Sequence, residues 1–152
     1  MIKTELIAAA IALMVGLPGV SDAVELYAGG KTEAEISTEI VIRCQYQIGE
    51  FGNVAVEMCI QSEHEARREL AAYPEETAEI VLRCTRTRYK AGWGMIKLCA
   101  DKDLAAQAAL QNYAPEHQSI IEACHDKVGL YGPAEVKECV DKQIASMRDG
   151  QQ

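Results

Sequence analysis

The chain has 152 residues, of which 49% are hydrophobic and 25% are charged, a composition typical of one globular domain. Its 15 Lys and Arg stand against 23 Asp and Glu, which gives a formal net charge of −8. This acidic balance argues against a general nucleic-acid binder or a binder of acidic membranes, because both need a net basic surface. Aromatic residues make up only 5%, so we expect a shallow core built mainly from aliphatic side chains and cysteine.

The first 23 residues have the pattern of a secretory signal peptide. Lys3 precedes an apolar run from Leu6 to Leu17, and Ser21 and Ala23 are small residues before a predicted cleavage between Ala23 and Val24. The apolar run is too short to cross about 30 Å of hydrocarbon as a helix. We therefore predict a periplasmic or secreted protein without a membrane span.

The cysteines indicate an internal repeat with a period of 40 residues. Cys44 and Cys59 are 15 residues apart, and the same pair recurs as Cys84 with Cys99 and Cys124 with Cys139. Other columns keep the same register: Ile40, Ile80 and Ile120; Gly52, Gly92 and Gly132; Val56, Ile96 and Val136. The sequence therefore predicts an N-terminal extension with the start of the first helix at 24–37, and a three-repeat domain at 38–152, divided into 38–77, 78–117 and 118–152.

The apolar spacing inside each unit is helical. The last unit places one amphipathic stripe on Val136, Cys139, Val140, Ile144 and Met147. Gly49 and Gly52 interrupt the first unit, where left-handed glycines can end one helix before the next begins. Each unit is thus predicted to be a helical hairpin and the fold class all-α, with helices near 33–48, 53–73, 75–90, 93–113, 116–128 and 133–148.

Capping residues agree with these boundaries. Thr32 and Glu35 have the spacing of a capping box at the start of the first helix. Three prolines suit the first positions of later helices: Pro74, Pro115 and Pro133. The helix starts are therefore predicted by residues that are independent of the apolar pattern.

The symmetry of the cysteines favours one disulfide inside each hairpin. The midpoint of Cys44 and Cys59 falls in the turn, so the two residues would face each other across antiparallel helices. Six cysteines allow 15 connectivities in principle, but only the pairs Cys44–Cys59, Cys84–Cys99 and Cys124–Cys139 respect both the repeat and the local geometry. An exported protein can form such bonds. Zinc and thiol-redox roles are weaker interpretations, because the chain has no closely spaced cysteine pair.

Tandem cysteine-stapled helical pairs resemble the secreted tetratricopeptide-like and Sel-like repeat proteins. The pattern of Cys124, Gly132 and Val136 to Asp141 is also similar to repeats in uncharacterised bacterial secreted proteins, along residues 38–149. The first resemblance implies hairpins stacked as a short α-solenoid, or as a compact bundle, that is used for binding. The second resemblance implies no activity.

We predict no catalytic residue, no cofactor site and no metal site. The histidines occupy three different repeat columns and have no recurring partner: His64, His117 and His125. Asp101 with Asp103, or Glu138 with Asp141, could form an acid and base pair, but helical surfaces supply such pairs by accident. A Ser-His-Asp order, a glycine-rich phosphate loop and an HExxH motif are all missing from the sequence.

Two clusters stand above this background. Residues 80–100 hold five cations and no acid: Arg83, Arg86, Arg88, Lys90 and Lys97. Five of the aromatic residues fall near the three turns: Tyr46, Phe51, Tyr89, Trp93 and Tyr131. The cations either mark a site or pair with acids of neighbouring hairpins: Glu50, Glu57, Glu135 and Glu138. The rings either line one edge of the stack or complete its core.

If the hairpins stack side by side, their turns meet at one edge and form a binding surface. The candidate surface comprises Phe51, Arg86, Arg88, Lys90, Trp93 and Tyr131. Aromatic residues beside arginine are the composition of interaction hot spots. We therefore expect a non-catalytic periplasmic or secreted interaction module that binds another envelope or secreted protein, or an anionic envelope ligand. The alternative is a small secreted enzyme whose site is assembled from scattered residues.

Overall fold

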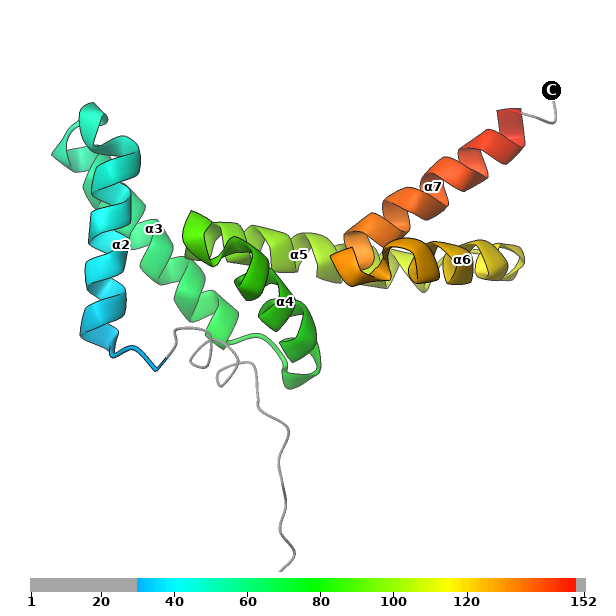
Figure 1. Ribbon diagram of the computed structural model, residues 1–152, viewed down its shortest axis with the longest axis horizontal. Helices are drawn as coiled ribbons and strands as arrows, with labels where there is room; N and C mark the ends of the chain where they lie inside the picture. Colours follow the sequence, from blue (N-terminus) through cyan, green and yellow to red (C-terminus); the bar gives the residue numbers. More distant parts are fainter. Residues whose placement is uncertain (1–29, 150–152) are drawn as a thin grey trace, which may run out of the picture.

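The computed structural model describes residues 30–149, where six α-helices pair into three consecutive hairpins and no strand is present (Figure 1). The N-terminal hairpin contains α2 (Glu33–Ile48) and α3 (Asn53–Ala71), the middle hairpin α4 (Ala78–Arg88) and α5 (Trp93–Leu110), and the C-terminal hairpin α6 (Gln118–Val128) and α7 (Pro133–Asp149). The all-α fold of three tandem hairpins is thus confirmed. The predicted signal peptide and its cleavage point lie outside the described residues.

Short 3-10 helices form the turns and the connections. The turns within hairpins are η1 (Gly49–Phe51), η3 (Tyr89–Ala91) and η5 (Gly129–Tyr131), and the connections between hairpins contain η2 (Glu75–Thr77) and η4 (Pro115–His117). Each element therefore recurs 40 residues after its counterpart, except that α2 starts earlier than α4 and α6.

Two helices begin two or three residues later than expected. We expected helices from 75 and 116, but α4 begins at Ala78 and α6 at Gln118, because the residues after Pro74 and Ala114 first form a single 3-10 turn. In the first of these turns the N–H of Thr77 donates to the carbonyl oxygen of Pro74 at 2.9 Å. Pro115 therefore starts the 3-10 helix η4, and only Pro133 starts an α-helix.

The start of α2 and the first turn show how local chemistry ends helices. The predicted capping box is confirmed, because the Thr32 hydroxyl accepts from the N–H of Glu35 and the Glu35 carboxylate accepts from the N–H of Thr32. Gly52 has a φ of 91°, whereas Gly49 has a φ of −58°. The left-handed conformation expected for both glycines thus occurs only at Gly52.

All three predicted disulfides are present, each within one hairpin. Their Cα–Cα distances are 5.8 Å for Cys44–Cys59, 5.7 Å for Cys84–Cys99 and 5.8 Å for Cys124–Cys139. The first cysteine of each pair is fully buried, so each bond lies at the contact between the two helices. Each closes a 15-residue separation, which contributes roughly 3 kcal/mol in the chain-entropy model.

The hydrophobic core has two parts. The larger part joins the N-terminal and middle hairpins and includes Ile40, Leu70, Val81, Trp93 and Ile96. The smaller part lies in the C-terminal hairpin around Cys124, Val136 and Val140. The core is thin because it contains only the side chains on the helix faces that meet within and between the hairpins.

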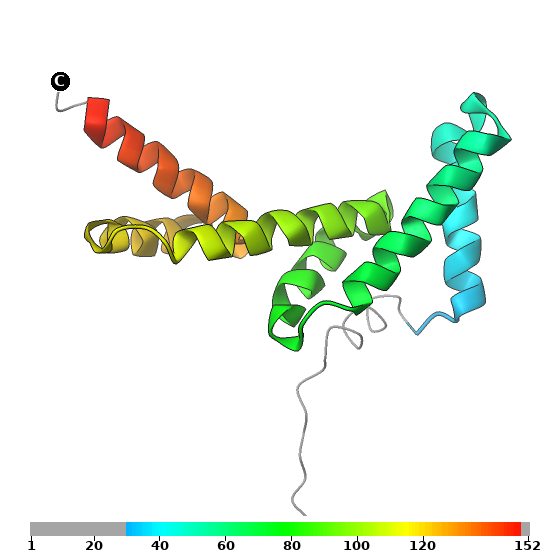
Figure 2. The ribbon, with the colours of Figure 1, turned by 180° about the vertical axis from the view of Figure 1, so that it is seen from behind.

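Consecutive hairpins contact each other mainly through their second helices. α5 packs against both α3 and α7, and the N-terminal and C-terminal hairpins lie at opposite ends of the array, as Figure 2 shows from behind. None of the described helices combines the length and apolar character needed to cross a membrane.

The turns do not meet along one edge, contrary to the expectation from side-by-side stacking. The middle turn binds Glu63 in the middle of α3, about 16 Å along that helix from Gly52. The last turn binds Asp103 in α5 in the same way. The middle and last turns therefore each dock on the side of the preceding hairpin, because a carboxylate there accepts hydrogen bonds from the N-terminus of the incoming helix.

Candidate functional site

Glu63 joins the N-terminal hairpin to the middle hairpin. Its carboxylate accepts hydrogen bonds from the backbone N–H groups of Trp93 at 2.7 Å and Gly94 at 3.2 Å, and it pairs with the Arg43 guanidinium at 2.7 Å. Both charged side chains are largely buried, with 14% of Arg43 and 13% of Glu63 exposed. A carboxylate at this place satisfies free N–H groups and complements the positive end of the helix dipole. Glu63 therefore caps α5, whose own N-cap residue Gly92 has no side chain.

Asp103 joins the middle hairpin to the C-terminal hairpin by the same device. Its carboxylate accepts from the N–H of Ala134 at 3.0 Å and pairs with Arg83. Arg83 also donates to the carbonyl oxygen of Tyr131 at 2.8 Å. Arg83 and Asp103 lie 40 residues after Arg43 and Glu63. We call each set of arginine, carboxylate and capped helix N-terminus a junction.

Glycine is required where the junctions close. A Cβ added at Gly92 would lie 2.5 Å from Glu63 Oε2, and one added at Gly132 would lie 2.5 Å from Arg83 Cζ. Gly52 occupies the corresponding position in the N-terminal hairpin and also has a positive φ, but a Cβ there would meet no described atom within 4 Å. A charged side chain of the preceding hairpin therefore covers the N-cap glycines of α5 and α7, but no described residue covers that of α3.

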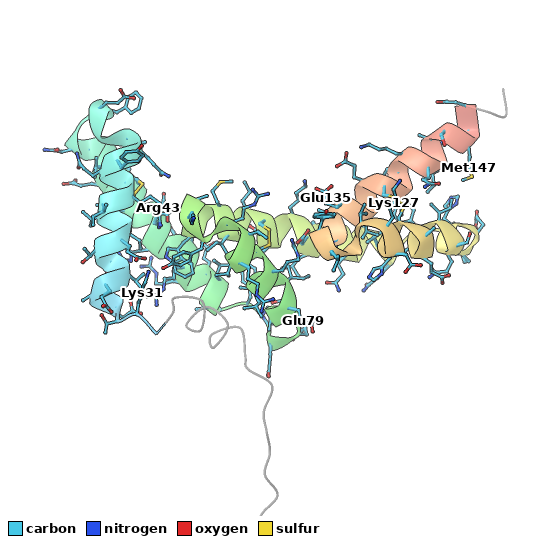
Figure 3. All side chains as sticks on the ribbon, viewed as in Figure 1. Lys31, Arg43, Glu79, Lys127, Glu135 and Met147 are labelled. Carbon is cyan, nitrogen blue, oxygen red and sulfur yellow. A yellow bond between two sulfur atoms is a disulfide. The ribbon has the colours of Figure 1, made fainter. Side chains whose placement is uncertain are left out.

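The C-terminal hairpin lacks the charged half of a junction. Ala123 and Gln143 stand where the other hairpins carry arginine and a carboxylate. Gln143 lines a shallow groove of about 270 Å³ beside α7, together with Lys127 and Glu135, both labelled in Figure 3. Glu138 and Lys142 also line this groove, so the surface is charged but has no arginine and carboxylate at the junction positions.

A second contact also recurs between successive hairpins. The Tyr73 hydroxyl donates to Asp101 and the Tyr113 hydroxyl donates to Asp141. Burial and the hydrogen bond to Asp101 raise the pKa of Tyr73 to about 12. Burial would raise the pKa of Asp101, but hydrogen bonds from Lys97 and Tyr73 outweigh it and lower that pKa. Tyr73 is therefore kept protonated and Asp101 is kept ionised, which are the states in which the hydroxyl can donate to the carboxylate.

Trp93 is a core residue and not part of an accessible surface. Only 2% of it is exposed. The Tyr89 ring meets its edge at a centroid distance of 5.7 Å, and the Arg67 guanidinium lies 5.6 Å from its ring centre. The ring is buried because the middle turn docks on α3, so a ligand cannot reach it in this structure.

The other predicted surface residues are exposed, but the structure does not gather them. Phe51 and Tyr131 lie in different turns and are 71% and 69% exposed. Arg86, Arg88 and Lys90 are exposed at the end of α4 and in η3. These three cations are close to one another only along the chain, and Phe51 and Tyr131 belong to the turns of the other two hairpins.

Arg83 and Lys97, two of the five clustered cations, form ion pairs within or between hairpins. Arg83 pairs with Asp103, and Lys97 pairs with Glu69 at 3.1 Å and Asp101 at 2.8 Å. These partners differ from the acids that the sequence suggested, because the junctions bring mid-helix carboxylates to the cations. Asp101 and Asp103, which the sequence analysis did not favour as an acid and base pair, are each paired with a different cation.

One group of potential metal ligands lies within the described part of the chain. Cys84, Cys99 and Asp103 bring their ligand atoms within 4.8 Å of one another. The two sulfurs are joined in a disulfide and Asp103 is paired with Arg83, whereas metal binding by cysteine requires thiolates. With the disulfide formed, these three residues stabilise the fold and do not offer thiolate ligands to a metal.

The sequence analysis missed a set of exposed apolar side chains on the two helices and the turn of the N-terminal hairpin. Its members are large side chains that are each more than half exposed: Tyr46 at 91%, Val54 at 72%, Phe51 at 71%, Met58 at 64% and Ile42 at 63%. We call these five residues the N-terminal apolar surface. The repeat columns contain the signal, because the C-terminal hairpin carries Glu122 and Glu138 where this hairpin carries Ile42 and Met58.

Comparisons with protein-family models, with curated proteins and with solved structures find no match for this chain. Function must therefore be argued from the chain's own surfaces. The N-terminal apolar surface and the exposed cations at the end of α4 are the two that stand out.

Proposed function

We propose that this protein is a non-catalytic interaction module of the periplasm or the extracellular space, exported by a signal peptide in residues 1–23. The N-terminal apolar surface carries the proposal. Large apolar side chains gathered on one exposed part of a protein mark a site for a partner more often than a random surface does. The partner is therefore another envelope or secreted protein.

The stapled hairpin suits a binding role. The Cys44–Cys59 bond fixes α2 against α3, the helices that carry Tyr46 and Met58. A surface that is already ordered loses little conformational freedom when a partner binds, so more of the contact energy remains as affinity. The three disulfides are also compatible with an oxidising compartment.

The exposed cations at the end of α4 support an acidic partner or an anionic envelope ligand. Arg86, Arg88 and Lys90 are three exposed cations within a five-residue stretch of a chain of net charge −8. Such a group would steer an anionic partner towards the middle turn, and salt would weaken the attraction. We expect Arg88→Ala to weaken binding by about 1 to 2 kcal/mol if Arg88 is a hot spot.

Affinity capture with matched variants tests the proposal. Residues 24–152 are immobilised and exposed to the envelope fraction of the host, and retained proteins are quantified by mass spectrometry. We expect a specific partner that is lost with Tyr46→Ser/Phe51→Ser and kept with Leu130→Ser, which changes an equally exposed side chain in the last turn (93% exposed). Unfolding curves must be the same for all three proteins. If no partner is retained, or the double variant retains it fully, the proposal is wrong.

A further inference from the structure

The N-terminus of α3 presents a junction surface that nothing in the described chain occupies. Its N-cap Gly52 has φ 91° and ψ 172°, close to the values of Gly92 (109°, 169°) and Gly132 (110°, 170°). The two later glycines are covered by charged side chains of the preceding hairpin, whereas Gly52 is not. The open surface has the backbone shape of the closed ones.

The closed junctions show what this shape accepts. At α5 and α7 the occupant is a carboxylate from the middle of a helix, and an arginine of the neighbouring helix holds that carboxylate. The same recognition occurs with Glu63 and with Asp103, so it tolerates either length of acidic side chain. The occupied N-termini of α5 and α7 therefore indicate that the N-terminus of α3 would also bind a carboxylate.

At the N-terminus of α3, the N–H groups that could bind a carboxylate are unpaired within the described residues. The backbone N–H groups of Asn53 and Val54 have no hydrogen-bond acceptor among the described residues, and both side chains are exposed. Val54 also belongs to the N-terminal apolar surface, and Met58 lies one helical turn beyond it. A docking helix would therefore satisfy the free N–H groups and bury apolar area at the same time.

A second copy of this chain is a poor occupant. The only surface that could follow the internal pattern is that of the C-terminal hairpin, where Ala123 and Gln143 replace the arginine and the carboxylate. Such a head-to-tail contact would also leave both ends open and build a filament. Without that arginine and carboxylate, the contact lacks its charged half.

We propose that the open N-terminus of α3 binds a helical segment of a different protein that presents a carboxylate held by an arginine, in the manner of Glu63 and Arg43. This inference rests on the proposed function, because it names the class of partner for the N-terminal apolar surface. The carboxylate caps the N–H groups of Asn53 and Val54, and the apolar side of the partner helix covers Val54 and Met58.

A donor can be built from the chain itself. The variant Val54→Asp/Ala123→Arg/Gln143→Asp restores the charged pair on the C-terminal hairpin and blocks its own α3 with a repelling carboxylate. Asp in the first turn of α3 also complements the helix dipole, so this substitution leaves the helix stable. The wild-type chain, which keeps an open α3 and has Ala123 and Gln143 in its C-terminal hairpin, is the receptor.

Sedimentation velocity of the oxidised donor mixed with the wild type is the test. We expect a 1:1 complex that weakens with added salt, while each protein alone stays monomeric. The control donor Val54→Asp/Ala123→Arg, which keeps Gln143, should bind at least about tenfold more weakly, because a charged acceptor forms a stronger hydrogen bond than a neutral one. Unfolding curves and intact disulfides establish that both donors are folded.

Three results would overturn the inference. The first is a folded donor that does not bind the wild type. The second is equal binding by the control donor, which would remove the role of the carboxylate. The third is a wild-type chain that associates by itself and is made monomeric by Val54→Asp, which would make a second copy the occupant. If any of these occurs while partner capture still depends on Tyr46 and Phe51, the proposed function stands and this inference alone is lost.

Discussion

The carboxylate of Glu63 accepts a hydrogen bond of 2.7 Å from the backbone N–H of Trp93, 30 residues further along the chain. This one contact caps α5 and fixes where the middle hairpin docks on α3. Arg43 neutralises the carboxylate in a largely buried setting. The order of the array thus depends on a charge pair that spans one hairpin and reaches into the next.

Glu63→Gln should destabilise the protein by about 2 kcal/mol, because it leaves Arg43 partly buried without its counter-charge and weakens the cap of α5. The free energy of unfolding in urea measures the effect. Glu57→Gln is the control, since Glu57 is exposed on the same helix and should change stability by less than about 0.5 kcal/mol. Equal effects of the two substitutions would contradict the role of Glu63.

Gly92→Ala and Gly52→Ala separate backbone strain from loss of a junction. Both substitutions place a side chain at a positive φ, which costs about 1 to 3 kcal/mol. Only Gly92→Ala also displaces the Glu63 carboxylate. Its free energy of unfolding should therefore fall by about 1 to 2 kcal/mol more than that of Gly52→Ala. Thermal and urea unfolding of the pair provide the comparison. A larger loss for Gly52→Ala would show that the open end is not open.

Trp93→Ala should destabilise the chain by about 3 to 5 kcal/mol, because the ring is buried at the contact between α3 and the middle turn. Phe51→Ala, at a turn that docks on no other hairpin, should change stability by less than about 0.5 kcal/mol. Circular dichroism during urea unfolding gives both values. A stable Trp93→Ala variant would place the ring at the surface.

The middle disulfide should contribute roughly 3 kcal/mol. Replacing Cys84 and Cys99 together by Ala removes one staple and keeps the other two, and denaturant unfolding measures the loss. Peptide mapping without reductant should recover only the three bonds within hairpins. A bond between two hairpins, or free thiols in the protein isolated without reductant, would refute the stapled-hairpin fold.

Alkaline pH should weaken the contact between Tyr73 and Asp101. The pKa of Tyr73 is raised from 10.0 to about 12 in the folded chain, so its contribution to stability is complete below about pH 10 and is lost as the pH rises through about 12. Tyr73→Phe lacks this ionisation and should show a shallower fall of unfolding free energy over that range. Identical pH profiles for the two proteins would exclude the effect.

The sequence predicted the helices, the turns and the disulfides because these depend on local spacing. Apolar residues recur at helical intervals, and Cys44 and Cys59 are equally distant from the turn between them. Residues far apart determine the junctions. Arg43 and Glu63 lie on different helices, and Glu in one hairpin becomes Asp in the next and Gln in the last, which hides the column.

The accessibility of the aromatic residues could not be predicted for the same reason. Phe51 and Trp93 both lie near a turn, yet Phe51 is exposed and Trp93 is buried. The difference arises because the middle turn docks on α3, whereas no hairpin within residues 30–149 precedes the first turn. The residues near each turn do not predict whether that turn docks on another hairpin.

Amide hydrogen exchange tests the central claim, that two junctions are closed and the N-terminal one is open. The N–H groups of Trp93 and Gly94 donate to Glu63, so they should exchange more slowly than those of Asn53 and Val54, which occupy the same positions of the same turn. NMR of the oxidised wild-type chain measures all four rates under native conditions. The account predicts protection at Trp93 and Gly94 and rapid exchange at Asn53 and Val54. Equal exchange in the two helices would contradict it.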